Sequence, residues 1–337
     1  MKPAETLGKL EIKALLAGEA DDWLFARADA VKRQYFGKEI WLRGIVEFSS
    51  YCRCDCHYCG LRAANRDIER YRLSHQEIID SALKVDKAGI GTLVLQSGED
   101  SRFRQDGISR ILSTIKQQTQ LAITLSLGER SHSELALWRE AGADRYLLKL
   151  ETLDAELYSR LRPGRVLDKR LRLLETLKSL GYETGSGIIC GLPGSKSDAL
   201  ADALLALSAM ELEMLAVGPF VSHPQTPLAN TANGKVLECQ RACAILRLLN
   251  PGANIPATSA LDALQSGARL DSLSRGCNVL MPSFTPQKDS SKYLIYPGKN
   301  ASGCPLEQRL ADIRLSLKAR GLHCSADRGN ARRQINV

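Results

Sequence analysis

Residues 49–60 read Ser49-Ser50-Tyr51-Cys52-Arg53-Cys54-Asp55-Cys56-His57-Tyr58-Cys59-Gly60. This stretch holds three cysteines, Cys52, Cys56 and Cys59, in the spacing C-x3-C-x2-C. Thiolates this close together, directly after the apolar run of residues 44–48, are typical ligands of an iron–sulfur cluster. Three ligands for a four-iron cluster leave one iron open to a small molecule. The stretch therefore predicts a reaction site at the end of a strand.

Two other readings of these cysteines are weaker. Zinc sites usually pair two C-x2-C motifs across a longer gap, and the loop offers no second pair. Disulfide frameworks suit short secreted domains, whereas this chain has 337 residues and opens on charged residues instead of an apolar signal core. We therefore expect a cytoplasmic protein. Cys54 falls outside the ligand spacing, and we expect it to be a bystander.

The composition is that of an ordinary globular protein, with 44% hydrophobic and 25% charged residues. The net charge of +8 comes from dispersed basic residues, and aromatic residues make up only 5% of the chain. A stacking surface for nucleic acid is therefore not expected, and a small anionic substrate explains the charge better. No apolar run is long enough to predict a membrane span.

Short apolar runs alternate with amphipathic stretches from residue 41 onward, as in a parallel sheet covered by helices. We expect helices within residues 5–38 and at 74–88. The eight expected strands cover residues 41–48, 92–96, 122–126, 145–150, 183–189, 214–220, 254–258 and 277–281. Their even spacing predicts an α/β fold, a complete (β/α)8 TIM barrel, with a doubly wound open sheet as the alternative. The expected parts are a helical extension at 1–40, the barrel at 41–290 and a C-terminal extension at 291–337 packed on it.

Polar residues follow several of these strands, at the end where a barrel places its chemistry. Ser97-Gly98-Glu99 follows the second strand, and its small residues would let the backbone approach an ammonium group. Glu129 and Glu151 follow the third and fourth strands and predict either ligand contacts or ion pairs at the rim. The glycines within residues 185–191 indicate either a closely approaching ligand or tight strand packing. His223 is read as a loop residue, with substrate contact as the alternative.

The cysteine spacing and Ser97-Gly98-Glu99 resemble the radical S-adenosylmethionine (SAM) enzymes. Further segments resemble one family among them, HydE, the maturases of FeFe-hydrogenase. The segments that carry this second resemblance are residues 59–62, 71–73, 95–100, 124–129, 142–148, 161–163, 191–194, 218–220, 223–224, 226–230, 254–258 and 296–299.

The resemblance implies a full barrel with a large cavity, one 4Fe–4S cluster, and SAM bound at the open iron. It implies reductive cleavage of SAM with an electron from an external donor, and a small anionic iron–cysteine–carbonyl–cyanide precursor as substrate. Other hydrogenase maturases are the implied partners. Carried over residue by residue, the catalytic metal ligands are Cys52, Cys56 and Cys59. The implied SAM pocket consists of Tyr58, Ser97, Glu99, Thr124, Glu129, Glu151, Arg170, Met214 and Tyr296. The implied substrate contacts are Thr258, Ser259 and Tyr293.

The chain departs from this family at Lys149 and Leu150, where many members carry an arginine and a histidine. Lysine keeps the charge but cannot grip a carboxylate with two parallel hydrogen bonds. The region of a second cluster offers only Cys304, so a single cluster is expected. Two alternatives stay open: a methylornithine synthase-like mutase, and sulfur insertion as in biotin synthase. Sulfur insertion would need cysteines on successive strands, and residues 122–126 contain none.

Overall fold

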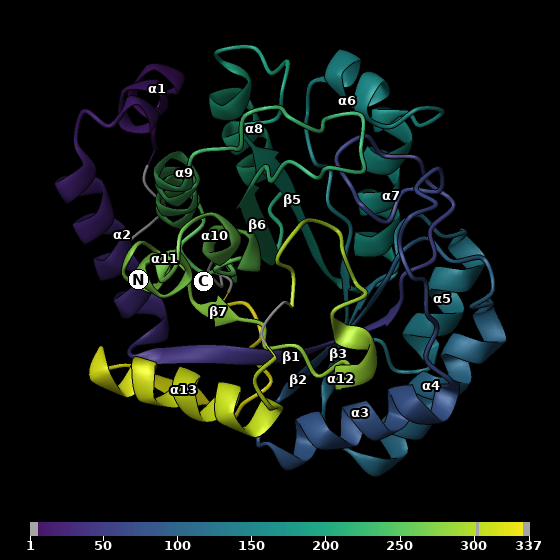
Figure 1. Ribbon diagram of the computed structural model, residues 1–337. Coiled ribbons are helices and arrows are strands. Elements are labelled where there is room, and N and C mark those ends of the chain that lie inside the picture. Colours follow the sequence, from purple (N-terminus) through teal and green to yellow (C-terminus); the bar gives the residue numbers. More distant parts are fainter. Residues whose placement is uncertain (1–5, 301–302, 333–337) are drawn as a thin grey trace.

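The computed structural model describes residues 6–300 and 303–332. Its centre is a parallel sheet enclosed by helices (Figure 1). The strands are β1 Glu39–Ser49, β2 Thr92–Ser97, β3 Ala122–Ser126, β4 Arg145–Leu147, β5 Glu183–Cys190, β6 Met214–Pro219, β7 Val279–Leu280 and β8 His323–Ser325. Their order is β6-β5-β4-β3-β2-β1-β7, and β8 pairs with the start of β1. The predicted α/β class with parallel strands is confirmed.

The expected complete barrel of eight regular strands is found only in part. Residues 254–258 form no regular strand; single bridges join Met214 to Asn254 and Pro256 to Val279. Pro256 has no N–H to donate to a ladder, which limits strand formation there. The side chain of Asn254 bonds Asn278 and the carbonyl of Gly329. The regular sheet is therefore a partial barrel, and irregular backbone spans the gap between β6 and β7.

Helices surround the sheet, and the short helix α10 lies at the cavity. They are α1 Lys9–Ala17, α2 Asp21–Phe36, α3 His75–Lys87, α4 Gln105–Gln118, α5 His132–Glu140, α6 Ala155–Leu161, α7 Leu167–Ser179, α8 Ala199–Ala209, α9 Val236–Leu249, α10 Ser259–Leu264, α11 Ala268–Asp271, α12 Gln287–Ser290 and α13 Leu306–Ala319, with a short 3-10 helix, η1, at Ser272–Ser274. The amino-terminal helices α1 and α2 lie against α8 and α9 (Figure 1). Among the described residues, no helix combines the length and apolar character needed to cross a membrane.

Local sequence signals explain where the helices begin. Ser74 precedes α3 and accepts a hydrogen bond from the main-chain N–H of Glu77, while the Glu77 carboxylate accepts the N–H of Ser74 at 2.8 Å. This reciprocal capping satisfies N–H groups that the first helical turn leaves free. Ser131 and Glu134 cap α5 in the same way. Helices fixed at their amino ends place the preceding loops consistently at the carboxyl ends of the strands.

The chain beyond β8 passes under the amino ends of the strands. The fully buried guanidinium of Arg145, on β4, donates to the carbonyl of Arg328 at 2.6 Å and to Thr92 Oγ1 at 3.1 Å. The main-chain N–H of Ala331 donates to the carboxylate of Glu183 at 2.6 Å. Residues 326–332 therefore close this face of the barrel. We refer to them as the tail.

Truncating the chain after Ser325 is expected to lower the free energy of unfolding by about 3–5 kcal/mol, because the buried side chains of Arg145 and Arg43 would lose neutral acceptors in the tail, although Arg145 keeps its ion pair with Glu183. Urea denaturation measures this change. Arg328→Ala is the matched control: Arg145 bonds its main-chain carbonyl, and its side chain is exposed, so a loss of at most about 1 kcal/mol is expected. Equal stability of the truncated and full-length chains would contradict this role of the tail.

Candidate active site

A cavity of about 340 Å³ lies at the carboxyl ends of the strands. The side chains of Cys52, Cys56 and Cys59 all line it, and so does Cys54. The loop after β1 carries all four cysteines, so one segment of chain brings the thiols to one wall of the cavity.

The start of the cysteine loop is held by main-chain hydrogen bonds. The N–H groups of Cys54 and Glu99 both donate to Cys52 Sγ at 3.4 Å. A side-chain hydrogen bond with Cys54 lowers the pKa of Cys52 and raises that of Cys54 to about 12. Burial raises the pKa of Cys59 to about 12. Cys52 is thus the cysteine of the loop whose surroundings most favour a thiolate, the form that binds metal.

Gly98 allows the loop to lie this close to β2. A Cβ atom at Gly98 would clash with the carbonyl oxygen of Tyr51 and come within 2.7 Å of Cys52 Cβ. The sequence suggested that a small residue here lets the backbone approach a ligand. The structure places the cysteine loop on the Cβ side of Gly98, and the approach of this backbone to an ammonium group stays a prediction.

The donor set fits a four-iron cluster better than a single ion. Among the described residues, no three Cys, His, Asp or Glu side chains converge on one metal-sized point. Three cysteines on one short loop at the cavity wall are the ligand set of a four-iron cluster that keeps one iron open. Cys54 Sγ accepts a hydrogen bond from Arg165 Nη2 at 3.1 Å. Its bystander role stays a prediction.

Most residues expected at the SAM and substrate sites line this cavity. They are Tyr58, Ser97, Glu99, Thr124, Glu151, Arg170, Met214 and Tyr296, together with Thr258, Ser259 and Tyr293. The exception is Glu129, which is buried outside the lining, 3.0 Å from Arg165 and 3.6 Å from Arg170. These arginines lie in and just after the loop between α6 and α7. The SAM contact predicted for Glu129 stays a prediction without support from this geometry.

Glu99 is already engaged by protein groups. Its carboxylate lies 3.2 Å from both Arg53 Nε and Arg165 Nη2, and it accepts the main-chain N–H of Glu129 at 3.1 Å. Arg162 is a further cation at 3.8 Å. Arg53, Arg162 and Arg165 therefore neutralise the carboxylate of Glu99 beside the cysteine loop.

Several buried polar atoms in the cavity lack a protein partner. Thr124 Oγ1, Thr258 Oγ1, and the Nε and Nη1 atoms of Arg170 make no hydrogen bond within the described residues. Buried polar groups are normally hydrogen-bonded, so these atoms indicate a place for a polar ligand.

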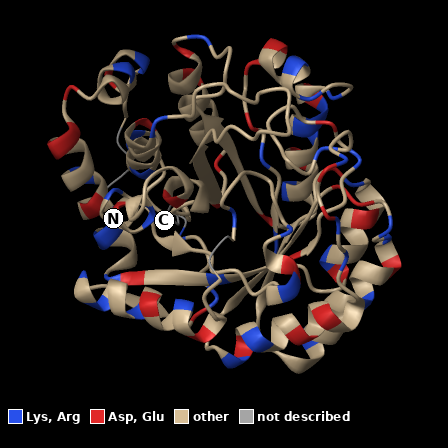
Figure 2. Ribbon diagram, in the orientation of Figure 1, with Lys and Arg blue, Asp and Glu red and all other residues tan. Residues whose placement is uncertain are grey.

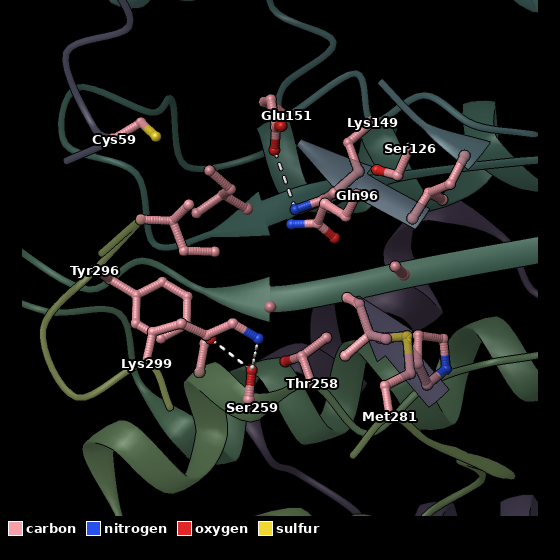
Figure 3. Close-up of a pocket in the computed structure, with 18 of the residues that line it drawn as sticks. Cys59, Gln96, Ser126, Lys149, Glu151, Thr258, Ser259, Met281, Tyr296 and Lys299 are labelled. Carbon is pink, nitrogen blue, oxygen red and sulfur yellow. Dashed lines mark hydrogen bonds and ion pairs between the residues drawn. The ribbon is translucent and has the colours of Figure 1, made fainter. Parts of the chain in front are cut away.

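Two polar walls face each other across the cavity (Figure 3). On one, Lys149 Nζ lies 3.0 Å from the carboxylate of Glu151, whose backbone has a φ of 68°. On the other, Ser259 Oγ lies 2.6 Å from Tyr296 Oη and accepts from Lys299 Nζ at 3.3 Å. A positive φ in a glutamate is unfavourable, and such strain concentrates at functional sites.

The sequence analysis missed several cations of the cavity. Arg43 is buried within β1 and donates to Met214 Sδ at 3.0 Å and to the carbonyl of Gly329 at 3.1 Å. Burial lowers the pKa of Arg43 to about 9, so it stays charged at neutral pH. Arg269 donates to the carbonyls of Ala257 and Met281, both at 3.0 Å. One feature of the sequence could have predicted Arg43 at the cavity. Side chains alternate along a strand, so residues 43 and 45 lie on the same face of β1.

The sequence left two interpretations open for the glycines of β5, namely ligand approach or tight strand packing. It also left two for His223, namely a loop residue or a substrate contact. A Cβ at Gly187 would clash with the carbonyl of Ala216, and one at Gly185 would come within 2.7 Å of Met214 Cβ. These glycines therefore permit tight packing of β5 against β6. His223 is buried against Gly60, outside the cavity lining, and burial lowers its pKa.

A parallel sheet whose first strand leads into a C-x3-C-x2-C loop beside a polar cavity defines a radical SAM enzyme. The sequence profile of the Radical SAM superfamily matches residues 46–207. Enzymes of this class use a 4Fe–4S cluster and SAM. The chain is 46% identical over 276 residues to the [FeFe] hydrogenase maturase subunit HydE of Thermotoga maritima, covering 82% of this chain and 79% of that protein. The chain therefore belongs to the HydE family.

More distant similarity extends to a neighbouring group. The chain is 29% identical over 316 residues to the 3-methylornithine synthase of Methanosarcina acetivorans, which is 91% of this chain and 87% of that protein. A crystal structure of methylornithine synthase superposes with a TM-score of 0.80 at 25% identity, covering 95% of each chain. The predicted relation to this group is confirmed.

Proposed function

We propose that this enzyme cleaves SAM reductively and serves the assembly of the di-iron cofactor of FeFe-hydrogenase. The proposed substrate is a small anionic iron complex carrying cysteine, carbonyl and cyanide groups. The observation that carries the proposal is the charge of the cavity, whose lining contains six cationic side chains and two carboxylates. The cations are Arg43, Lys149, Arg162, Arg170, Arg269 and Lys299, and the carboxylates are Glu99 and Glu151.

In this proposal Cys52, Cys56 and Cys59 hold the cluster. A cluster bound there would supply the electron for reductive cleavage of a sulfur–carbon bond of SAM. Ser97, Thr124, Glu151, Arg170 and the other lining residues named above orient SAM. Thr258, Ser259 and Tyr293 contact the substrate. The hydroxyl of Thr258, which lacks a protein partner, is free to donate to an anionic ligand.

Local pairing of charges supports an anionic substrate. Glu99 is surrounded by arginines and Glu151 lies against Lys149, so each carboxylate has a cation beside it. The hydrogen bonds of Arg43 and Arg269 go to neutral acceptors. Neither guanidinium forms a direct ion pair among the described residues, and an anion in the cavity would stabilise both charges.

A mutase acting on a free amino acid is the second candidate, favoured by the similarity to methylornithine synthase. Such a substrate would bring an ammonium group that needs an available carboxylate. Asp262, an acidic residue of α10, accepts the N–H of Arg269 at 2.9 Å and does not line the cavity. Sulfur insertion is less favoured because β3 carries no cysteine. Action with other maturases, an external reductant and a cytoplasmic location stay predictions.

The test is coexpression of the chain with apo-hydrogenase and its other maturases under anaerobic conditions. Active hydrogenase is expected with the natural chain and not with Cys56→Ala. Thr258→Val should lower hydrogenase activation while leaving substrate-free cleavage of SAM unchanged, because the change removes one hydroxyl from the substrate end of the cavity. Conversion of lysine to methylornithine without hydrogenase activation would overturn the proposal in favour of the mutase.

A further inference from the structure

Two surface hollows flank the start of the cysteine loop. One is lined by Tyr51 and the other by Arg53, the residues on either side of Cys52, and both reach Phe103. The side chain of Arg53 is 54% exposed. A molecule seated over these hollows would therefore be one residue away from a proposed cluster ligand.

Cationic side chains outnumber acidic ones in the hollows, although Arg53, Arg72, Arg130 and Arg172 are each paired with a carboxylate. Together they are lined by eight cationic and four acidic side chains. Three of the cations, Arg102, Arg104 and Lys169, are exposed, and no ion pair of their side chains occurs within the described residues. In Figure 2, Lys and Arg segments alternate with Asp and Glu segments along α6, α7 and the neighbouring loops on the right. We call this surface the basic face.

An exposed apolar residue lies in the same region. Val166, directly before α7, is 61% exposed and follows Arg165, which contacts both Cys54 and Glu99. The main-chain N–H of His57 donates to the carbonyl of Leu161 at 2.9 Å, which ties the cysteine loop to the segment before α7. An apolar centre surrounded by charged groups is the usual anatomy of a protein interface.

Helix orientation adds to the positive potential. The first turns of α4 and α5 and the start of α7 contribute Gln105, Ser131 and Lys169 to one hollow. The amino ends of helices carry partial positive charge, so backbone dipoles and side chains act in the same direction there. The acidic residues of this hollow are partly neutralised, since Glu129 pairs with Arg165 and Glu134 with Arg130.

We propose that the basic face is the docking surface for a small acidic electron-carrier protein, which reduces the cluster through the Tyr51–Cys52–Arg53 segment. One electron leaves the carrier, which is oxidised by one electron, and the cluster is reduced by one; no bond forms or breaks. Complementary charge would speed encounter and make it sensitive to salt. This inference depends on the radical SAM chemistry of the enzyme and not on the identity of its substrate.

The probe is an acidic flavodoxin in its hydroquinone state, tested against reconstituted enzyme. The variant is the triple charge reversal Arg102→Glu, Arg104→Glu and Lys169→Glu. We expect its binding to flavodoxin, measured by calorimetry at low salt, to weaken by about tenfold or more. Stopped-flow reduction of the cluster by flavodoxin should slow to a similar extent. Reduction by dithionite, a small inorganic reductant, should be unchanged.

The matched control reverses the same number of charges elsewhere. Lys84 and Lys87 lie in the last turn of α3 and Lys318 in the last turn of α13, and all three are exposed. Their triple change to glutamate should leave binding and reduction by flavodoxin within about twofold of the natural chain. Equal losses in both triple variants would overturn the proposal, as would unchanged flavodoxin binding by the first. A first variant that loses binding to RNA instead of flavodoxin would make the surface a nucleic-acid site and also overturn it.

Discussion

Replacing Cys56 with alanine is expected to remove bound iron and to reduce SAM cleavage to background. The natural chain should hold about four irons after anaerobic reconstitution. With one of three ligands gone, the two remaining thiols cannot hold the cube with a single open iron. The same result is expected for Cys52→Ala and Cys59→Ala. Iron analysis and the yield of 5′-deoxyadenosine measure it.

Cys54→Ser is the control within the same loop. Cys54 lies in the cavity wall but outside the C-x3-C-x2-C spacing, so iron and SAM cleavage should be retained. Loss of the cluster in this variant would show that the ligand register includes Cys54. Iron near eight per chain in the natural protein would contradict a single cluster.

Gly98→Ala is expected to have the second-largest effect, again on the cluster. The new methyl group would meet Tyr51 and Cys52, so the loop must move away from β2. Overpacking of this kind costs roughly 1–3 kcal/mol, and here it falls on the segment that presents a ligand. We expect the iron content to fall by at least about threefold, while the protein stays folded by circular dichroism.

Gly303→Ala provides the comparison for this change. A Cβ at Gly303 would meet no atom of the described residues within 4 Å, so iron content and stability should not change. Full iron occupancy in Gly98→Ala would show that the loop adapts without loss. That result would also show that close packing against the cysteine loop does not explain why residue 98 is a glycine.

Features encoded over a few neighbouring residues could be predicted from the sequence. The strand at 122–126 was predicted with its observed bounds, because an apolar run between helical segments marks both of its ends. The cysteines were recognisable because their spacing is local. Most strand-end residues reached the cavity because parallel strands present their carboxyl ends at one edge.

Features that depend on distant parts of the chain could not be predicted. The strand β8 has three residues, too few for a periodic pattern, and forms through pairing with β1. The burial of Arg43 depends on Met214 and Gly329, both far away in the sequence. Glu129 was expected in the cavity, but arginines that follow α6 hold it outside. Pairings of this kind have no local signature.

The tail has a consequence for biosynthesis. Residue pairs such as Glu39 with His323 and Arg145 with Arg328 join segments that are synthesised far apart in time. The amino-end face of the barrel can therefore be completed only after residues 323–331 have been synthesised. Contacts of such long sequence separation also slow folding.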